Sequence, residues 1–397
     1  MEITDVTTTK ISTDSWGAFV EFPLVTVMSG HEAYRNADGE NPGARRDWTG
    51  PTSDVVVRVE TDAGITGYGH GNWLTGAIAT IVDETLSKLV VGEDPTHRER
   101  LWDQMYRATI PFGRKGAAVE AISAVDIALW DIAGKAAGKP VYELLGGPVD
   151  DEIRCYASNL HPVDHDDLAA EAIDYVEQGY DLLKLRFKHG PEAGRAGRDE
   201  NEAVVRTVRE AVGDEIEIAG DAYMGWSVRY ARKMIDRLER YEMAWVEEPV
   251  IPDQIDGYAE LRSSVDTPIA GGEHEFTRWG HRELLERDAV DILQPDVHRA
   301  GGLTELKRIA DMASAHGRPV VPHTGTPPTL HFVAATQNAP MAEHITTPCW
   351  FEGDDGDTYA DAIYENPPEP TDGAVPLPEG PGVGAFNEEA IRHFAVE

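Results

Sequence analysis

Cysteine and long apolar runs are what this sequence most clearly lacks. Its 397 residues include two cysteines, Cys155 and Cys349, which lie far apart and form no CxxC pair. This argues against a disulfide framework and against a cysteine zinc site. No apolar run approaches membrane-spanning length, and the first residues have neither the basic segment nor the apolar core of a secretory signal. We expect a globular cytoplasmic protein that does not contact membranes.

Positive charge is also scarce. The chain has 35 lysines and arginines, only nine of them lysine, against 71 aspartates and glutamates, for a net charge of -36. The basic residues form no cluster, which excludes a nucleic-acid binder. The acids are dispersed, and this carboxylate-rich, lysine-poor composition resembles that of proteins from extreme halophiles, where salt screens self-repulsion. A polyvalent cation-binding surface is the functional alternative.

Short β-branched runs alternate with longer amphipathic stretches from residue 150 onward. The runs include "IRCYAS", "DLLKLRF", "IEIAGDAY", "MAWVEEP", "VDILQPD" and "RPVVPHT". Continuous apolar runs are typical of parallel strands covered on both faces, and the alternation indicates crossover units. Eight strand-like runs in one series favour a (β/α) barrel over an open sheet. A doubly wound fold would also need a glycine-rich phosphate turn after its first strand, and "CYASNLHP" is not one.

A polar residue stands at the end of each of six successive runs. These residues follow one another at intervals of 20 to 27, about one strand and helix each time: Asp221, Glu247, Glu273, Asp296, His323 and Glu343. The carboxyl ends of barrel strands meet at one rim, which is where barrel active sites lie. We therefore expect all six side chains to share one site.

The three successive acids Asp221, Glu247 and Glu273 suit a hard divalent cation with oxygen ligands, and Mg²⁺ is the natural choice. The structural alternative is that arginines neutralise them. On the next strands, Asp296 and His323 would form a pair in which the carboxylate fixes the imidazole tautomer and raises its basicity, as in a general base or acid. Glu343 would hydrogen-bond the substrate or developing charge.

Lys184, Arg186 and Lys188 alternate along the second run, so they would share the face that lines the barrel interior or its rim. Cations beside a metal suit a substrate carboxylate and the enediolate that forms from it. The alternative is that they serve only to neutralise the acids.

Together these motifs resemble the enolase superfamily, in its mandelate racemase subgroup. The resemblance rests on "WVEEP", "GGEHE", "QPD", "VPH" and, in the first part of the chain, "VVVRVETDAGITGYG". It implies a modified TIM barrel of (β/α)7β form at 126–349 and an α+β capping domain at 1–125, with a C-terminal return at 350–397. It also implies one Mg²⁺ per subunit on Asp221, Glu247 and Glu273, with Asp296 and His323 as the catalytic dyad, in a homo-oligomer.

Within the subgroup, the stretches "DGYAELR" and "PGVGAFN" are most similar to L-rhamnonate dehydratases and related acid-sugar dehydratases. The resemblance implies a hydro-lyase that removes the C2 proton of an aldonic acid and eliminates its 3-hydroxyl, giving a 2-keto-3-deoxy acid. Two-base racemases of the subgroup commonly carry a lysine where this chain has Arg186, and arginine is a poor base near neutrality. That difference favours chemistry run by His323 alone.

Other functions stay open at this point. A racemase or epimerase would need Lys184 or Lys188 as its second base, and a cycloisomerase or another lyase is a further alternative. A catalytically silent metal-binding scaffold is the alternative from another class. The resemblance implies that two capping-domain loops select the substrate, and the first of them would be "MSGHEAYRNADGENPGARRDWTGP". The candidate side chains are His31, Arg45, Arg46 and Trp48, together with Lys188. Which acid sugar they would select stays open.

Overall fold

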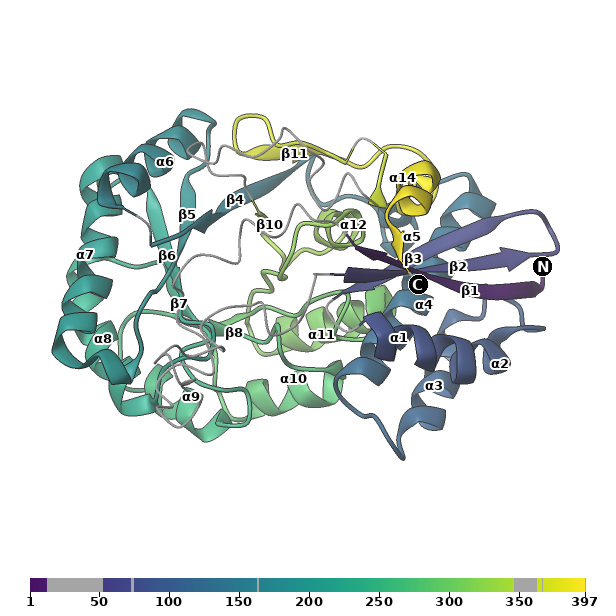
Figure 1. Cartoon of the computed structure of the whole chain (residues 1–397), viewed down its shortest axis with the longest axis horizontal. Coiled ribbons are helices and arrows are strands. Elements are labelled where there is room, and N and C mark those ends of the chain that lie inside the picture. Colours follow the sequence, from purple (N-terminus) through teal and green to yellow (C-terminus); the bar gives the residue numbers. More distant parts are fainter. Residues whose placement is uncertain (13–52, 73–74, 163, 346–362, 366, 397) are drawn as a thin grey trace.

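The computed structural model describes residues 1–397 except 13–52, 73–74, 163, 346–362, 366 and 397. It has two parts that lie side by side, an α+β part at the right of Figure 1 and a larger barrel-like part at the left. The predicted substrate-binding residues His31, Arg45, Arg46 and Trp48 lie outside the described residues. No helix in the described ranges has the length and apolar character needed to cross a membrane.

The α+β part is built on an antiparallel sheet with strand order β12-β1-β2-β3. Its strands are β1 (Ile3–Ser12), β2 (Ser53–Thr61), β3 (Thr66–Asn72) and β12 (Ala395–Val396). Its helical segments are α1 (Thr75–Ile81), η5 (Val82–Leu86), α2 (Ser87–Val90), α3 (Arg98–Thr109) and α4 (Ala117–Ala137).

Helix α4 lies directly on this sheet because β3 carries glycine at every second position. A Cβ at Gly69 would come within 2.0 Å of the Ala124 carbonyl oxygen, and one at Gly67 within 2.3 Å of that of Ala128. Side chains there would force the helix away from the sheet. Helix α4 also packs against α11 (Gly302–Ala315) of the barrel, so it joins the two parts. The predicted boundary after residue 125 falls within this helix.

Strands and helices alternate through the larger part. After α5 (Val141–Leu145) the order is β4 (Glu152–Leu160), α6 (His165–Glu177), β5 (Leu182–Arg186), α7 (Gly194–Val212), β6 (Glu217–Asp221), α8 (Val228–Leu238), β7 (Trp245–Glu247), α9 (Ile255–Arg262), β8 (Ile269–Gly271), α10 (Thr277–Glu286), β9 (Ile292–Leu293), α11, α12 (Pro327–Ala334) and β10 (Ala342–His344). Short 3-10 turns, η6 (Pro191–Ala193) and η7 (Glu239–Tyr241), precede α7 and follow α8. The helices wrap the outside of the strands (Figure 1).

The strands pair in parallel in the order β10-β4-β5-β6-β7-β8-β9. The segment 320–323 supplies the seventh strand position, where it is joined to its neighbour by two isolated parallel bridges, Leu293 to Val320 and Asp296 to His323. Because β10 pairs with the first strand, β4, the series returns on itself. Eight strand positions with seven helices between them confirm the predicted (β/α)7β fold with an α+β capping domain.

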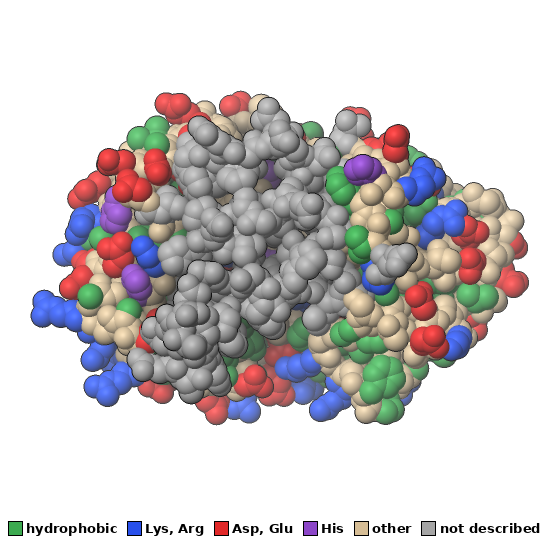
Figure 2. All heavy atoms as spheres, viewed as in Figure 1, with side chains coloured by type: hydrophobic (Ala, Val, Ile, Leu, Met, Phe, Trp, Pro, Cys, Tyr) green, Lys and Arg blue, Asp and Glu red, His purple; other side chains and the backbone are tan. Residues whose placement is uncertain are grey.

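The C-terminal segment contacts both parts. Strand β11 (Ala374–Pro376) pairs antiparallel with the start of β4, α14 (Glu388–His393) follows, and β12 pairs with β1 of the capping sheet. Figure 2 shows acidic side chains scattered around this face of the molecule rather than gathered in one patch. Dispersed surface acids agree with the sequence pattern.

Candidate active site

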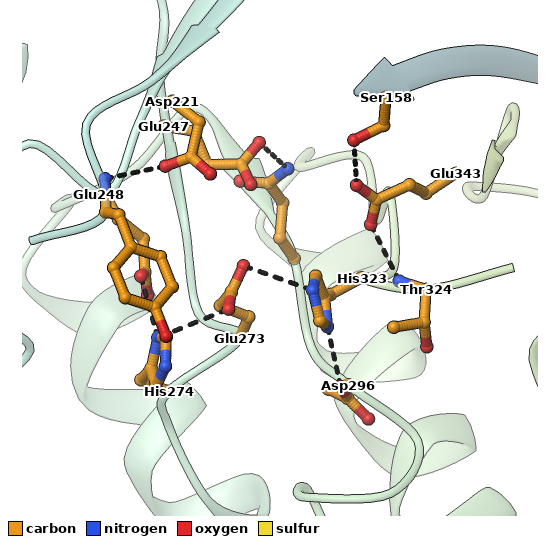
Figure 3. Close-up of polar contacts among 12 residues, drawn as sticks. Ser158, Asp221, Glu247, Glu248, Glu273, His274, Asp296, His323, Thr324 and Glu343 are labelled. Carbon is orange, nitrogen blue, oxygen red and sulfur yellow. Dashed lines mark hydrogen bonds and ion pairs between the residues drawn. The ribbon is translucent and has the colours of Figure 1, made fainter. Parts of the chain in front are cut away.

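Backbone register brings three of the predicted side chains into one row at the carboxyl end of the barrel. Arg186 ends β5 and pairs with Asp221, which ends β6 and pairs in turn with Glu247, the last residue of β7. Glu273 follows β8 by two residues. All four therefore lie along the same rim, and in Figure 3 the three carboxylates point toward a common space that His323 also borders.

Asp221 is buried and held from two sides. The Arg186 guanidinium forms an ion pair with its Oδ2, and the Tyr223 amide donates to its Oδ1 over 2.7 Å. Tyr223 has a positive φ of 39°, so the chain turns sharply just beyond the strand. This turn aims the amide back at the carboxylate.

Glu247 lies between Lys184 and two neutral donors. Lys184 Nζ is 2.6 Å from its Oε1, while Trp245 Nε1 and Gln294 Nε2 donate to its Oε2 over 3.0 and 2.7 Å. Lys184 is fully buried and also lies 2.9 Å from Glu343. Burial by itself would lower the pKa of Lys184, but the carboxylates of Glu247 and Glu343 outweigh it and raise that pKa, so the ammonium stays charged.

Glu273 is surrounded by cations. Arg299 Nη1 is 3.0 Å from its Oε1, and His323 Nε2 is 3.6 Å from its Oε2. Burial would raise the pKa of Glu273, but His323, His274 and Arg299 together hold it well below its usual range. The carboxylate is therefore ionised despite being buried.

Asp296 and His323 lie in direct contact. His323 Nδ1 is 2.7 Å from Asp296 Oδ2, and the His298 amide donates to the other oxygen of Asp296 over 2.6 Å. Burial opposes the charge on His323, but Glu273, Glu343 and Asp296 outweigh it and raise the imidazole pKa. With Nδ1–H donated to Asp296, Nε2 is the nitrogen that faces the carboxylates.

Glu343 is held by the protein at both oxygens. Ser158 Oγ donates to one over 2.5 Å and the Thr324 amide to the other over 2.7 Å (Figure 3). Burial would raise the pKa of Glu343, but Lys184 and other cations lower it to about 2. The contacts orient Glu343 toward Lys184 and Ser158, a serine that the sequence reasoning did not select.

Lys188 stands apart from this cluster. It is half-buried, its amide donates to Asn201 Oδ1 over 3.2 Å, and no ion pair of its side chain is found in the described part of the chain. Its neighbour Phe187 faces the opposite side and packs on Trp226. The alternation of the second run therefore separates Phe187 from the cations, while the contacts bring only Lys184 and Arg186 to the carboxylates.

A second group of possible ligands overlaps the first. Glu248, Glu273 and His274 have ligand atoms within 4.8 Å of one another, and His274 Nδ1 lies 2.7 Å from Glu248. Burial raises the pKa of Glu248, so this carboxyl gives up its proton reluctantly. His274 was missed in the sequence, although it directly follows Glu273 in "GGEHE".

The first group suits Mg²⁺ better than the second. Asp221, Glu247 and Glu273 offer only oxygen donors, which a hard cation prefers, whereas the second group includes an imidazole nitrogen. Each of the three carboxylates already lies against a buried or partly buried cation: Arg186, Lys184 or Arg299. Among the described residues, however, only the second group has its ligand atoms within 4.8 Å of one another, so the three carboxylates of the first group would have to turn from these cations to share one ion.

Two family models match the chain. Residues 167–390 match "Enolase C-terminal domain-like", and residues 49–146 match "Mandelate racemase / muconate lactonizing enzyme, N-terminal domain". The L-rhamnonate dehydratase of Saccharopolyspora erythraea is 39% identical over 335 residues, which are 83% of this chain and 82% of that protein.

Solved structures agree with this match. Rhamnonate dehydratase from Gibberella zeae complexed with Mg superposes with a TM-score of 0.87 at 29% identity, over 100% of this chain and 96% of that one. The 3,6-anhydro-D-galactonate cycloisomerase from Zobellia galactanivorans superposes with a TM-score of 0.81 at 28% identity, over 100% of both chains. Matching models for both domains and a relative of 39% identity establish that this chain belongs to the enolase superfamily, in its mandelate racemase and muconate lactonizing enzyme family.

Proposed function

We propose that the protein is a Mg²⁺-dependent acid-sugar dehydratase, a hydro-lyase similar to L-rhamnonate dehydratase. The observation that carries this proposal is the dyad: Asp296 holds His323 Nδ1 at 2.7 Å and leaves Nε2 3.6 Å from Glu273, at the edge of the three carboxylates. The similarity to a dehydratase at 39% identity over most of both chains supports the same reaction.

Asp221, Glu247 and Glu273 are assigned as the magnesium ligands. A magnesium ion held there would supply Lewis acidity toward the substrate carboxylate and 2-hydroxyl, which would make the C2 proton more acidic. The solved relative complexed with Mg supports this choice of metal.

His323 carries both proton transfers. Its Nε2 takes the proton from C2, while Asp296 keeps Nδ1 protonated and stabilises the imidazolium that results. The electron pair from the C2–H bond then forms the C2–C3 double bond as the 3-hydroxyl leaves, and the imidazolium gives its proton to that hydroxyl. Water departs, and the enol tautomerises to the 2-keto-3-deoxy acid. The histidine returns to its starting state.

Lys184 and Arg186 supply fixed positive charge. Each is bound to a proposed metal ligand, so both lie near the negative charge that develops on the substrate carboxylate. Neither is suited to act as a second base, since Lys184 lies between two carboxylates and Arg186 is a guanidinium in an ion pair. This arrangement supports dehydration by one base over racemisation by two.

Specificity is proposed to come from His31, Arg45, Arg46 and Trp48, with Lys188 two residues beyond the end of β5. Their side chains could bind the hydroxyls or the distal end of the sugar chain. We also propose that the protein works in the cytoplasm and that it is a homo-oligomer. Size-exclusion chromatography with light scattering would test the oligomeric state.

A substrate screen tests the proposed function. Purified protein in molar KCl with Mg²⁺ is incubated with five- and six-carbon aldonic acids, L-rhamnonate included, and 2-keto acid is measured as its semicarbazone. We expect one or a few substrates to react, and the reaction to stop with EDTA or with His323→Asn. The matched control is His316→Asn, a surface histidine, which should stay active. Deuterium exchange at C2 without keto acid would instead establish a racemase or epimerase.

A further inference from the structure

A pocket lies between the capping domain and the barrel, among α3, α4 and α11 and away from the strand ends. Its volume is about 510 Å³, and its lining comes from the start of α3 and from facing side chains: Thr96, His97, Arg98, Glu99, Arg100, Trp130, Thr304 and Lys307. A volume of this size is within the usual range of small-molecule sites, about 300–1,000 Å³. The proposed reaction does not use it.

The lining is basic although the chain is strongly acidic. Over the whole sequence acids outnumber lysines and arginines 71 to 35, yet this pocket has two arginines, a lysine and a histidine against one acid. The acid, Glu99, is already paired with Arg308, and Arg100 is paired with Glu93. Arg98 and Lys307 form no ion pair in the part of the chain that the structure describes. Two cations are thus left to face the pocket.

Arg98 is held in place without using its hydrogen-bond donors. Its guanidinium lies over the Trp130 ring, 4.0 Å from the centroid, and its side chain makes no hydrogen bond to any described residue. Asp126 accepts its hydrogen bonds from the amide and hydroxyl of Thr304, over 2.9 and 2.6 Å, and no ion pair joins it to Arg98 in the described residues. Stacking occupies the face of the guanidinium and leaves its edge, which is the part that binds oxyanions.

The start of α3 adds to this charge. His97 is its N-cap residue and makes no side-chain capping hydrogen bond. The first amides of a helix and its dipole favour an anion at that end. The uncommitted guanidinium, the lysine and the helix start therefore all favour negative charge in the same cavity.

We propose that this pocket binds a phosphate group carried by a small molecule. A guanidinium edge, an ammonium and free helix amides together match the several oxygens of a phosphate, and the pocket is larger than a phosphate alone. The assignment does not depend on the proposed dehydratase reaction, because binding is measured directly.

Calorimetric titration of the full chain with Mg²⁺ present tests the proposal. The probes are inorganic phosphate and glucose 6-phosphate, and the variants are Lys307→Met and Arg98→Met. Lys233→Met, an exposed lysine on α8, is the matched control. We expect one site per chain, tighter for the ester than for free phosphate, and at least about tenfold weaker in each pocket variant, since a charge-assisted hydrogen bond is lost. The control should bind like wild type.

Several titration results would overturn the proposed phosphate site. Absence of saturable binding at millimolar probe, or binding that neither pocket variant changes, would overturn the site. If Lys233→Met weakens binding as much as the pocket variants do, the effect reflects the overall charge of the protein, and the proposed site is overturned as well. If free phosphate binds as tightly as the ester, the pocket is a site for the inorganic ion and not for a phosphorylated metabolite. Lys307 is exposed, so its variant should fold even if loss of the Arg98 stack disturbs α3.

Discussion

Two aspartates of equal burial behave in opposite ways. Asp296 at the mouth of the barrel and Asp126 at the seam between α4 and α11 are both fully buried. Burial alone would raise the pKa of each. The pKa of Asp296 is nevertheless lowered, by its hydrogen bond to His323 and by Arg299, whereas that of Asp126 is raised to about 7. Burial therefore does not decide the charge of a carboxyl group here.

The groups that contact each carboxyl group decide whether it is charged. Asp296 faces an imidazole and a guanidinium, while Asp126 accepts hydrogen bonds from the amide and hydroxyl of Thr304, which carry no charge. The mouth of the barrel thus holds ionised acids among cations, a state suited to metal and substrate. The seam holds an acid close to neutrality, which suits a packed joint between domains.

Mg²⁺ binding by two variants is the test with the largest expected effect. Asp221→Asn should weaken Mg²⁺ binding by at least about 100-fold, because loss of even an outer partner of a ligand costs about 10–100-fold. Dehydratase activity should fall to background. Glu248→Gln should bind Mg²⁺ nearly as well as wild type, since its carboxyl is not one of the proposed ligands. Calorimetric titration of both variants measures this. The reverse result would move the ion to Glu248, Glu273 and His274.

The second test makes the same Asp→Asn substitution at the mouth of the barrel and at the seam between α4 and α11. Asp296→Asn should reduce kcat by about 10²–10⁴-fold, because His323 loses the carboxylate that fixes its tautomer and stabilises its charged form. Asp126→Asn should leave kcat close to wild type, since Asp126 is remote from the reacting atoms. Steady-state kinetics at saturating Mg²⁺ compares them. A large kcat loss in Asp126→Asn would show that the seam is coupled to the chemistry.

A third test concerns the buried cation. Lys184→Met leaves Glu247 and Glu343 without their shared partner and should lower the free energy of unfolding by about 3–5 kcal/mol. Lys188→Met should change it by less than about 0.5 kcal/mol, as expected for a residue outside such a network. Chemical denaturation of both variants without Mg²⁺ gives the two values. Equal effects would mean that the Lys184 network contributes little to stability.

A fourth test follows the slope of the unfolding free energy against pH. Asp126 has a pKa of about 7 in the folded protein and an ordinary value of 3.8, so the folded state keeps a proton that the unfolded state releases between these limits. Its contribution to stability is full below the ordinary value and is lost as the pH rises toward 7, by about 1.4 kcal/mol per unit. Asp126→Asn should remove this component, so it gains stability relative to wild type across that range. Chemical denaturation of wild type and Asp126→Asn at several pH values measures this. If the two plots of unfolding free energy against pH run parallel, the raised pKa of Asp126 is contradicted.

Much of the fold and site could be predicted because both follow from strand periodicity. Once "AWVEEP" is read as a strand, register alone places Glu247 beside Asp221. Ser158 and Gln294 could not be found in this way, since a lone serine or glutamine has no distinctive spacing and its contact depends on strands far apart in the sequence. The run "RPVVPHT" is reduced to isolated bridges because Pro319 and Pro322 have no amide hydrogen to donate.

The pairing of β12 with β1 has a consequence for synthesis. Lys10 and Ile11 are partnered by Val396 and Ala395, so this edge of the capping sheet stays open until the ribosome has made those residues, nearly 400 positions after β1 begins. An open edge can pair with another nascent chain. Strand β1 therefore stays exposed at this edge while the barrel is being synthesised, and slow translation lengthens the time in which it can pair with another chain.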